Sequence, residues 1–333
     1  MLYDFISIGG ATRDISFFTD QGILLDNHQD VLRQKLLAFE YGAKIRVDKF
    51  YYTFGGGAAN AAVNIANFGF KTACLAAVGA DRHGDLIIDN LQRRGVNASL
   101  MQKKKNIESG FSFILIAPSG ERIIFSERGA NDRLIIDSAQ KRFLKNTRNI
   151  YLSSLSGAWE KVAQAVFSEV DLVKRRLYWN PGAAQYAAGL KKIGGFLKKT
   201  FVLFVNKDEA IELALHAAGS VKPSIKFLNS TPNLLMAIKQ LGPEIVVITS
   251  GAEGVDAYDG QRFFHQNIRR EKKKVDTTGV GDIFNSSFAA GLEIFRGDID
   301  RALRLGIKNT ASKIAHLGAQ NGLIKFTPFK KRS

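Results

Sequence analysis

The chain has 333 residues, of which 45% are hydrophobic, and carries a formal net charge of +16 at pH 7. This length and composition allow a substantial buried core, and no apolar run reaches the roughly 18 residues that a membrane span requires. Cys74 is the only cysteine, which excludes an internal disulfide and predicts a buried, unreactive thiol. The first ten residues contain an early acid and no basic stretch, so they indicate a first strand, no signal peptide and a cytoplasmic protein.

The positive charge is scattered along the chain in short runs, such as 103–105, 174–176, 198–199 and 330–332. No run dominates, and no recognisable nucleic-acid-binding motif accompanies one. The sequence therefore predicts no specific nucleic-acid partner and no membrane partner. A solvated basic surface that attracts anionic nucleotides accounts for the charge.

Short apolar runs alternate with longer helical patterns, which is typical of βα units stacked around a mainly parallel sheet. In chain order we predict strand 5–9, helix 58–68, strand 72–78, helix 84–94, strand 149–153, helix 159–174, strand 177–180, strand 201–206, helix 208–218, strand 245–250, helix 281–295 and helix 299–317. Because there is no repeat and no proline-rich linker, we expect residues 1–333 to form a single domain.

Two segments, about 14–53 and 110–128, do not fit this alternation. The first ends in a strand-like alternation over 44–53, and the second places Pro118-Ser119-Gly120-Glu121 between two β-rich runs, which predicts a hairpin. Strands that interrupt a doubly wound domain at two places can pair as a small separate sheet. We expect that sheet to act as a lid over the crevice at the carboxyl ends of the main strands.

The most informative motif is Asp276-Thr277-Thr278-Gly279-Val280-Gly281-Asp282, which precedes an apolar helix. Glycines at the start of a helix let backbone N–H groups converge on an anion, and the helix dipole adds to the attraction. An aspartate in the first turn is suited to accept a proton from an attacking hydroxyl. The alternative is an ordinary glycine-containing helix start, in which Asp282 merely complements the dipole.

A second glycine-rich motif, Gly55-Gly56-Gly57-Ala58-Ala59-Asn60, leads into the helix predicted at 58–68. Small residues there allow close approach of a ligand, and Asn60 projects an amide from the first turn. The alternative is close packing of this helix against the sheet. Taken alone, this motif does not decide between the two.

Together, the two motifs resemble the two signatures of the ribokinase-like (PfkB) carbohydrate kinase family, and they occur in the family's order. Asn206-Lys207-Asp208-Glu209 looks like its N-x-x-E element, and 249–255 resembles its glycine-containing turn beside the nucleotide. Residues 311–320 resemble the helix and turn that border adenine, and Asp14 matches the aspartate that holds substrate hydroxyls. The resemblance covers nearly the whole chain, which has neither a P-loop nor the protein-kinase motifs.

The resemblance implies a three-layer α/β/α sandwich with a mainly parallel central sheet and a small β-sheet lid. It also implies an enzyme that transfers the γ-phosphoryl group of ATP to a hydroxymethyl group of a sugar or nucleoside. Asp282 would accept the hydroxyl proton, and the N–H groups of Gly279, Val280 and Gly281 would stabilise the phosphoryl oxygens. The implied acceptor-binding residues are Asp14, Gly56, Gly57 and Asn60. A homodimer formed through the lid is expected.

The resemblance also implies the nucleotide and metal contacts. ATP would contact Asn206, Thr249, Gly251, Gly254, Gly279, Gly281, Asn309 and Ser312. Asn206 and Glu209 would hold Mg²⁺ through water, because magnesium gives up its hydration reluctantly. The alternative for this pair is a turn at the strand end that caps the next helix. Asp276 and Thr278 resemble a loop that binds K⁺.

Three departures from the family pattern argue against ribose as the substrate: Val280 replaces a small residue, Gly57 stands where ribokinases often carry lysine, and the segment 17–50 is longer than the lid portion of simple ribokinases. Two other functions remain open. A phosphosugar kinase would require basic lid residues that face the acceptor, for which Arg13, Lys44 and Arg46 are the candidates. A catalytically silent nucleotide- or nucleic-acid-binding protein on the same scaffold is the other. Because these basic residues fit a solvent-facing surface equally well, we expect an uncharged acceptor.

Overall fold

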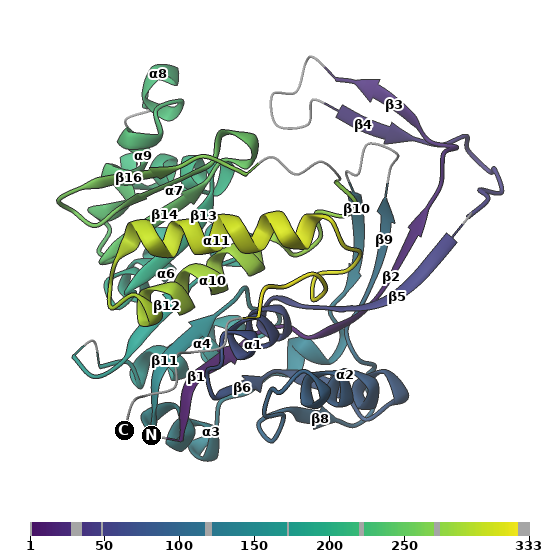
Figure 1. The fold of residues 1–333 in the computed structure, drawn as a ribbon, viewed down its shortest axis with the longest axis horizontal. Helices are drawn as coiled ribbons and strands as arrows, with labels where there is room; N and C mark the ends of the chain where they lie inside the picture. Colours follow the sequence, from purple (N-terminus) through teal and green to yellow (C-terminus); the bar gives the residue numbers. More distant parts are fainter. Residues whose placement is uncertain are drawn as a thin grey trace.

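The computed structural model describes residues 2–27, 35–47, 49–116, 122–171, 173–219, 223–269 and 274–325. Its central sheet has eight strands in the order β16-β15-β14-β13-β12-β11-β1-β6 (Figure 1). These strands are β1 (Tyr3–Ile8), β6 (Thr72–Leu75), β11 (Thr147–Leu152), β12 (Arg176–Trp179), β13 (Val202–Asn206), β14 (Ile245–Thr249), β15 (Val255–Tyr258) and β16 (Phe263–Gln266). The six strands from β6 to β14 are parallel, and β15 and β16 extend the sheet in antiparallel fashion.

Helices cover both faces of this sheet, because its buried strands send alternate apolar side chains to opposite sides. Phe5 packs with α1 (Gly57–Asn67), α10 (Val280–Ile294) and α11 (Ile299–Ile314). Its neighbour Ile6 belongs to the opposite core. That core contains residues of α4 (Trp159–Ser168), α6 (Leu190–Leu197), α7 (Lys207–Ala218) and α9 (Thr231–Lys239). The predicted three-layer α/β/α sandwich is confirmed.

Shorter elements complete the main body. They are β7 (Ala77–Gly79), α2 (Arg82–Arg93), β8 (Gln102–Lys104), the 3₁₀ helix η1 (Gly129–Arg133), α3 (Ser138–Lys145), α5 (Ala183–Ala187), α8 (Ile225–Leu228) and the 3₁₀ helix η2 (Gly251–Glu253). No helix within the described ranges is long and apolar enough to cross a membrane.

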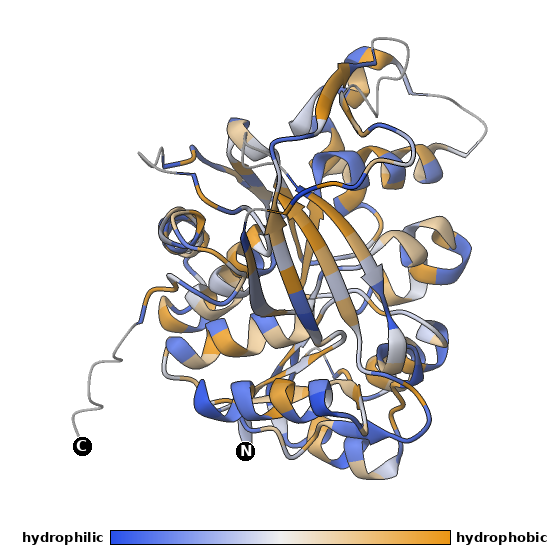
Figure 2. Cartoon of the chain, turned by 90° about the vertical axis from the view of Figure 1, so that its right-hand side faces the viewer, coloured by the Kyte–Doolittle hydropathy of each residue, from blue (hydrophilic) through white to orange (hydrophobic). Residues whose placement is uncertain are grey.

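A second sheet of four strands, here called the small sheet, stands to one side of the main body (Figures 1 and 2). Its order is β10 (Arg122–Glu127), β9 (Phe111–Ile116), β2 (Thr12–Phe18) and β5 (Lys49–Gly55). Strand β2 pairs in parallel with β9 and antiparallel with β5, so the two segments that interrupt the βα pattern do meet. Residues 28–34, 48 and 117–121 of these segments lie outside the described residues. The first segment also contributes a two-stranded sheet of β3 (Ile23–Asp26) and β4 (Lys35–Ala38).

One side chain, Asn131, links two of the places where the chain passes between the main body and the small sheet. Asn131 of η1, just after β10, accepts a hydrogen bond from the Ala11 N–H at 2.9 Å. Its amide donates to the Ala11 carbonyl at 3.0 Å and to the Arg128 carbonyl at 3.0 Å. Ala11 immediately precedes β2, so the entry to β2 and the exit from β10 are held together.

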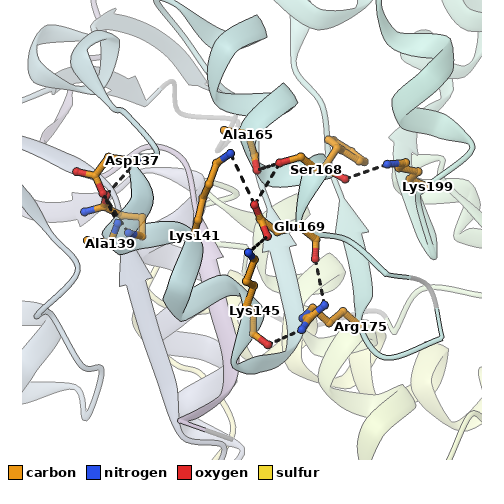
Figure 3. A network of polar contacts seen from close by, with 11 residues as sticks. Asp137, Ala139, Lys141, Lys145, Ala165, Ser168, Glu169, Arg175 and Lys199 are labelled. Carbon is orange, nitrogen blue, oxygen red and sulfur yellow. Dashed lines mark hydrogen bonds and ion pairs between the residues drawn. The ribbon is translucent and has the colours of Figure 1, made fainter.

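Three predicted elements differ from the structure. The helix predicted at 299–317 ends at Ile314. The strand predicted at 72–78 is divided at Ala76 into β6 and β7, and β7 pairs with β8 in a separate sheet. The helix predicted to reach residue 174 ends at Ser168. There, Lys199 donates to the Phe167 carbonyl at 3.2 Å, and Arg175 donates to the Glu169 carbonyl at 3.3 Å (Figure 3). These basic side chains satisfy carbonyls at the helix end, so the helix terminates without another turn.

Candidate active site

A cavity of about 510 Å³ lies between the small sheet and the carboxyl ends of the main strands. Eight of the residues predicted for catalysis, binding or cation contact line it: Asp14, Gly56, Gly57, Asn60, Thr278, Gly279, Gly281 and Asp282. They come from β2, the start of α1 and the start of α10. The structure therefore brings the two glycine-rich motifs and Asp14 to one place.

Asp282 lies in the first turn of α10 and faces α1 across the cavity floor. Asn60 of α1 donates from Nδ2 to Asp282 Oδ2 at 2.9 Å. Burial raises the pKa of Asp282, although the Asn60 hydrogen bond and the positive charge of Arg122 oppose this rise. A carboxylate that holds a proton more readily than an exposed aspartate is a stronger general base.

Asn60 is held in place by a chain of two further amide side chains, which the sequence analysis did not identify. Gln320 donates to Asn60 Oδ1 at 3.1 Å, and Asn90 of α2 donates to Gln320 Oε1 at 2.8 Å. All three amides are buried. The chain of donors fixes which end of the Asn60 amide faces Asp282. No local motif marks Asn90, because its role depends on contacts across more than two hundred residues of sequence.

The loop before α10 has the geometry of an anion site. Gly279 is the N-cap in the left-handed region at φ 72°, and a Cβ atom there would lie 2.5 Å from the Cβ of Ala319. Only glycine fits this position without strain. The Val280 N–H already donates to the Thr277 carbonyl at 3.3 Å. The N–H groups of Gly281 and Asp282 lie within the first turn, where a helix leaves its donors without intrahelical partners.

Asp14 lies in the middle of β2 and is almost completely buried. Thr12 donates to its Oδ1 at 2.8 Å. Burial raises the pKa of Asp14 to about 6, against the effects of the Thr12 and Ser112 hydroxyls and of Arg13. Its carboxylate is a buried hydrogen-bond acceptor on the wall of the cavity.

Asp276 is 1% exposed and lies beside the equally buried Lys313, which is 0% exposed. Burial would raise the pKa of Asp276, but the Lys313 charge and hydrogen bonds from Thr278 and Gly318 outweigh it and lower that pKa. Burial lowers the pKa of Lys313 to about 8. The sequence analysis named Asp276 but not its partner, which lies 37 residues further along the chain.

The cavity also contains side chains that the sequence analysis did not assign: Ser112, Arg122, Ser126, Arg128, Ser153, Ser154 and Asn180. Arg122 donates to Thr277 of the anion loop. The period-two spacing of 122, 124, 126 and 128 was the available signal, since alternate residues of a strand share a face. The spacing alone did not show which way this face of the strand points. The pairing of β9 with β2 places it toward Asp14.

The three basic residues considered for an acceptor phosphate do not line this cavity. Arg13 lies on the opposite face of β2, away from the cavity. Its guanidinium lies 4.4 Å from the ring centre of Phe54 and 5.1 Å from that of Tyr52. Lys44 and Arg46 precede β5 and are exposed or partly exposed. The two arginines that do face the cavity, Arg122 and Arg128, come from and directly after β10.

The residues predicted to contact the nucleotide lie mainly beyond this cavity. Asn206 and Thr249 are directly paired at the ends of β13 and β14, and η2 follows between Gly251 and Gly254. Asn206 Oδ1 accepts from the Glu209 N–H at 2.9 Å, while Glu209 Oε2 accepts from the Asn206 N–H at 2.8 Å. This reciprocal pair caps α7. Burial raises the pKa of Glu209 to about 6.

Two further predicted ATP contacts lie in α11. Asn309 is fully buried, donates to Asn64 at 2.7 Å and to Ser287 at 2.8 Å, and accepts from the Ile324 N–H at 2.8 Å. These bonds join α1, α10 and α11, so the Asn309 amide is occupied inside the core and does not face a nucleotide. Ser312 is partly exposed and donates to the Gly322 carbonyl at 2.7 Å.

Comparison with protein families gives one match that spans most of the chain. Residues 29–325 match the pfkB family carbohydrate kinase. Among curated relatives, an ATP-dependent 6-phosphofructokinase from Thermoanaerobacterium thermosaccharolyticum is 24% identical over 322 residues, 91% of this chain and 93% of that protein. A ribokinase from Mus musculus is 26% identical over 296 residues, 87% and 86% of the two chains.

Solved structures share the fold. A Burkholderia thailandensis nucleoside kinase in complex with inosine is similar with a TM-score of 0.75 at 17% identity, covering 96% of this chain and 94% of that one. An Arabidopsis thaliana ribokinase complexed with ribose and ATP has a TM-score of 0.73 at 20% identity, covering 97% and 96%.

Proposed function

The chain belongs to the pfkB family of carbohydrate kinases, and from this premise we propose that it transfers the γ-phosphoryl group of ATP to a hydroxymethyl group of a sugar or nucleoside. One observation carries the proposal: Asp282 faces the same cavity as the first turn of α10 and the buried carboxylate of Asp14. A general base, an anion site and a hydroxyl-binding group are the parts that this reaction needs.

In the proposed reaction, Asp14 accepts hydrogen bonds from acceptor hydroxyls, and Gly56 and Gly57 let the acceptor approach the start of α1. A Cβ atom at Gly57 would lie 2.8 Å from Ser153 Cβ and 3.4 Å from Asp282 Oδ1, so a side chain there would crowd the base. Asp282 accepts the proton of the attacking hydroxyl. The O–P bond to the acceptor then forms as the bond to the leaving ADP oxygen breaks.

The positive end of α10 stabilises charge on the transferring phosphoryl group, with the free N–H groups of its first turn as donors. We assign the nucleotide to the surface formed by Asn206, Thr249, Gly251, Gly254 and Ser312, beyond the anion loop. Oxygen donors at Asn206 and Glu209 suit a hydrated Mg²⁺, which when bound neutralises charge on the phosphates. The small sheet, as a lid, would exclude water from the reacting groups.

A second candidate substrate class is an anionic acceptor, such as a phosphorylated sugar or a sugar acid. It is favoured by Arg122 and Arg128, which line the cavity together with Asp14. Buried anionic groups require charged donors, and arginine binds phosphate or carboxylate with two parallel hydrogen bonds. This candidate replaces the earlier choice of Arg13, Lys44 and Arg46 with two arginines that face the cavity.

We further propose a homodimer formed through the outer face of the small sheet, and a cytoplasmic location. Phe50, Tyr52, Phe113, Ile123 and Phe125 are exposed on strands of this sheet, and hydrophobic strands occupy the middle of the face in Figure 2. An exposed apolar sheet face of this kind is typical of an interface between protein molecules. A second copy would bury it without blocking the cavity, whose lining side chains alternate with these.

The test is ADP formation from ATP and Mg²⁺ in the presence of matched sugars, phosphosugars, sugar acids and nucleosides. We expect acceptor-dependent turnover with at least one class, and the product should carry the phosphoryl group on a primary hydroxyl. ATP binding without turnover on any acceptor would support the catalytically silent alternative and contradict the proposal.

A further inference from the structure

We infer that the ammonium group of Lys313 is a built-in cation for the loop that precedes α10, so that phosphoryl transfer by this protein needs no monovalent metal ion. The inference rests on the proposed function for its catalytic consequence. It replaces the K⁺ site that the sequence predicted at Asp276 and Thr278 with a side chain of the protein itself.

The position of Lys313 carries the first step. Lys313 lies in the last turn of α11 and points toward the loop, where Nζ donates to the Asp276 carbonyl at 2.8 Å and lies 3.7 Å from Asp276 Oδ2. Both residues are sequestered from solvent, at 0% and 1% exposure. A lysine is almost never buried so completely unless an opposite charge accompanies it, because an isolated buried charge is very costly.

The surroundings of Asp276 carry the second step. Its Oδ1 accepts from the Thr278 N–H at 2.7 Å, and its Oδ2 accepts from the Gly318 N–H at 2.8 Å. Because the Lys313 ammonium donates to the main-chain carbonyl of Asp276, every acceptor group of Asp276 has a partner. A metal ion would have to displace the ammonium or place a second positive charge against a single buried carboxylate. The oxygens of Asp276 therefore offer no open position to K⁺ while Lys313 is present. Among the described residues, Thr278 Oγ1 is buried without a hydrogen-bond partner, but a single hydroxyl beside the ammonium does not by itself form a K⁺ site.

The connection to the cavity carries the third step. Asp276 holds the Thr278 N–H, and Thr278 and Gly279 line the cavity at the entrance to α10. Gly279 also packs against Ala319, next to the Gly318 that Asp276 holds. Lys313 is thus a positioning residue: it neutralises the carboxylate around which the anion loop and the turn after α11 are both arranged.

The first test uses the unaltered protein. Turnover is measured in salts of K⁺, NH₄⁺, Na⁺ and tetramethylammonium at one ionic strength, which removes general salt effects on a chain of net charge +16. We expect rates that agree within about twofold. A rate at least tenfold higher in K⁺ than in tetramethylammonium would overturn the inference. Absence of turnover in every salt would instead contradict the proposed function, and the stability test below would then decide about Lys313.

The second test asks whether a free ion can replace the side chain. Lys313→Ala leaves an empty space beside the charged Asp276. We therefore expect a lower melting temperature in tetramethylammonium, and a higher one again when K⁺ or NH₄⁺ is present. Activity should follow the same pattern, with at least a tenfold loss that the small cations restore. Lys313→Met fills the space without a charge, so small cations should not restore it. Lys308→Ala, at an exposed position of the same helix, is the control and should respond to no cation.

Each outcome decides the matter. Ion-specific recovery of the alanine variant but not of the methionine variant supports a cation role for Lys313. Equal behaviour of the two variants in all salts would mean that Lys313 only fills space, and the inference would be wrong. If Lys313→Ala does not fold in any salt, the wild-type comparison of K⁺ with tetramethylammonium still discriminates. The melting-temperature readout needs no acceptor, so it separates failure of this inference from failure of the proposed function.

Discussion

At the scale of single residues, the proposed base is held in a fixed orientation. Asp282 receives its hydrogen bond from Asn60, which Gln320 and Asn90 hold in turn. Asn90 donates to Gln320, Gln320 to Asn60, and Asn60 to Asp282, so no water molecule is needed to link these side chains. Buried polar networks of this kind are rigid when every member has its partner.

We predict that Asp282→Asn lowers kcat by about 10²-fold or more, because the amide keeps the shape of the side chain but cannot accept the proton. The dissociation constant for ATP should change little, since the N–H donors belong to the main chain. Calorimetry of ATP binding, alongside steady-state kinetics, measures both. Turnover close to that of the wild type would exclude Asp282 as the base.

Asp14 offers a prediction in which stability and binding change in opposite directions. Its pKa is raised from the ordinary 3.8 to about 6, so the folded protein binds this proton more tightly than the unfolded chain does. The ionised carboxylate therefore costs stability above pH 6, by up to about 3 kcal/mol, and this cost disappears as the pH falls toward 4.

Asp14→Asn should accordingly raise the melting temperature at pH 8 but hardly at pH 4, while it raises the KM for the acceptor. Thermal melts across this pH range, together with acceptor kinetics at pH 8, provide the check. A variant that is less stable than the wild type at pH 8 would show that the carboxylate contributes more than its burial costs.

Sequence patterns selected cavity residues that belong to local motifs, and missed those whose partners are distant in the sequence. The 276–282 motif marked Asp282 because a glycine-rich helix start has a recognisable local geometry. Lys313 and Gln320 carry no such mark, since a lysine or glutamine near a helix end is usually exposed. Lys313 is buried where α11 packs against the anion loop, and Gln320 is buried where the turn after α11 meets Asn60 of α1 and Asn90 of α2.

At the scale of elements, the two faces of the small sheet have different tasks. One face carries Asp14, Ser112 and Arg122 toward the cavity, and the other carries the exposed aromatic side chains. Strands in 44–53 and 110–128 were predicted, but β2 was not, and neither was which basic residues face the cavity. That depends on register, and a shift of one residue turns every side chain to the other face.

If the acceptor is anionic, Arg128→Ala should lower kcat/KM for it by about 10- to 100-fold, the usual loss for a hydrogen bond to a charged group. The matched uncharged acceptor should be nearly unaffected. Lys44→Ala/Arg46→Ala is the control, because neither residue lines the cavity. If the double variant, and not Arg128→Ala, removes the preference for the charged acceptor, the assignment to Arg128 is wrong.

The small sheet should also respond as one unit. Because β2 pairs with both β5 and β9, acceptor binding should slow hydrogen exchange in all three strands together. ATP alone should protect 251–254 and the end of α11. Mass spectrometry of exchanged peptides measures this, and protection of β9 without β5 would argue against closure of the sheet as a single lid.

At the scale of the whole molecule, the predicted layers followed from the alternation of apolar strands with amphipathic helices. The elements that escaped prediction include β2 of the small sheet, the helices α3, α6 and α9, and the antiparallel pair β15 and β16. These helices have only 8 or 9 residues, too few for a clear helical pattern. They acquire definite structure by packing on the central sheet, a contribution that a local pattern does not contain.

The proposed homodimer gives a prediction at this scale. Phe125 is 58% exposed on the outer face of the small sheet, and Phe125→Asp places a charge in the proposed interface. Sedimentation equilibrium should give a dimer mass for the wild type and a monomer mass for the variant. Val173→Asp, at an exposed position on the main body, should leave the dimer unchanged. A monomeric wild type would contradict the proposal.

The clamp at Asn131 has a mechanical consequence. Since it ties the residue before β2 to the segment after β10, the small sheet leaves the main body through coupled connections and not through independent strands. If the small sheet opens and closes, we expect these two connections to move together, because the amide of Asn131 bonds both Ala11 and Arg128. The two ends of the small sheet would then keep their spacing in the open and the closed state.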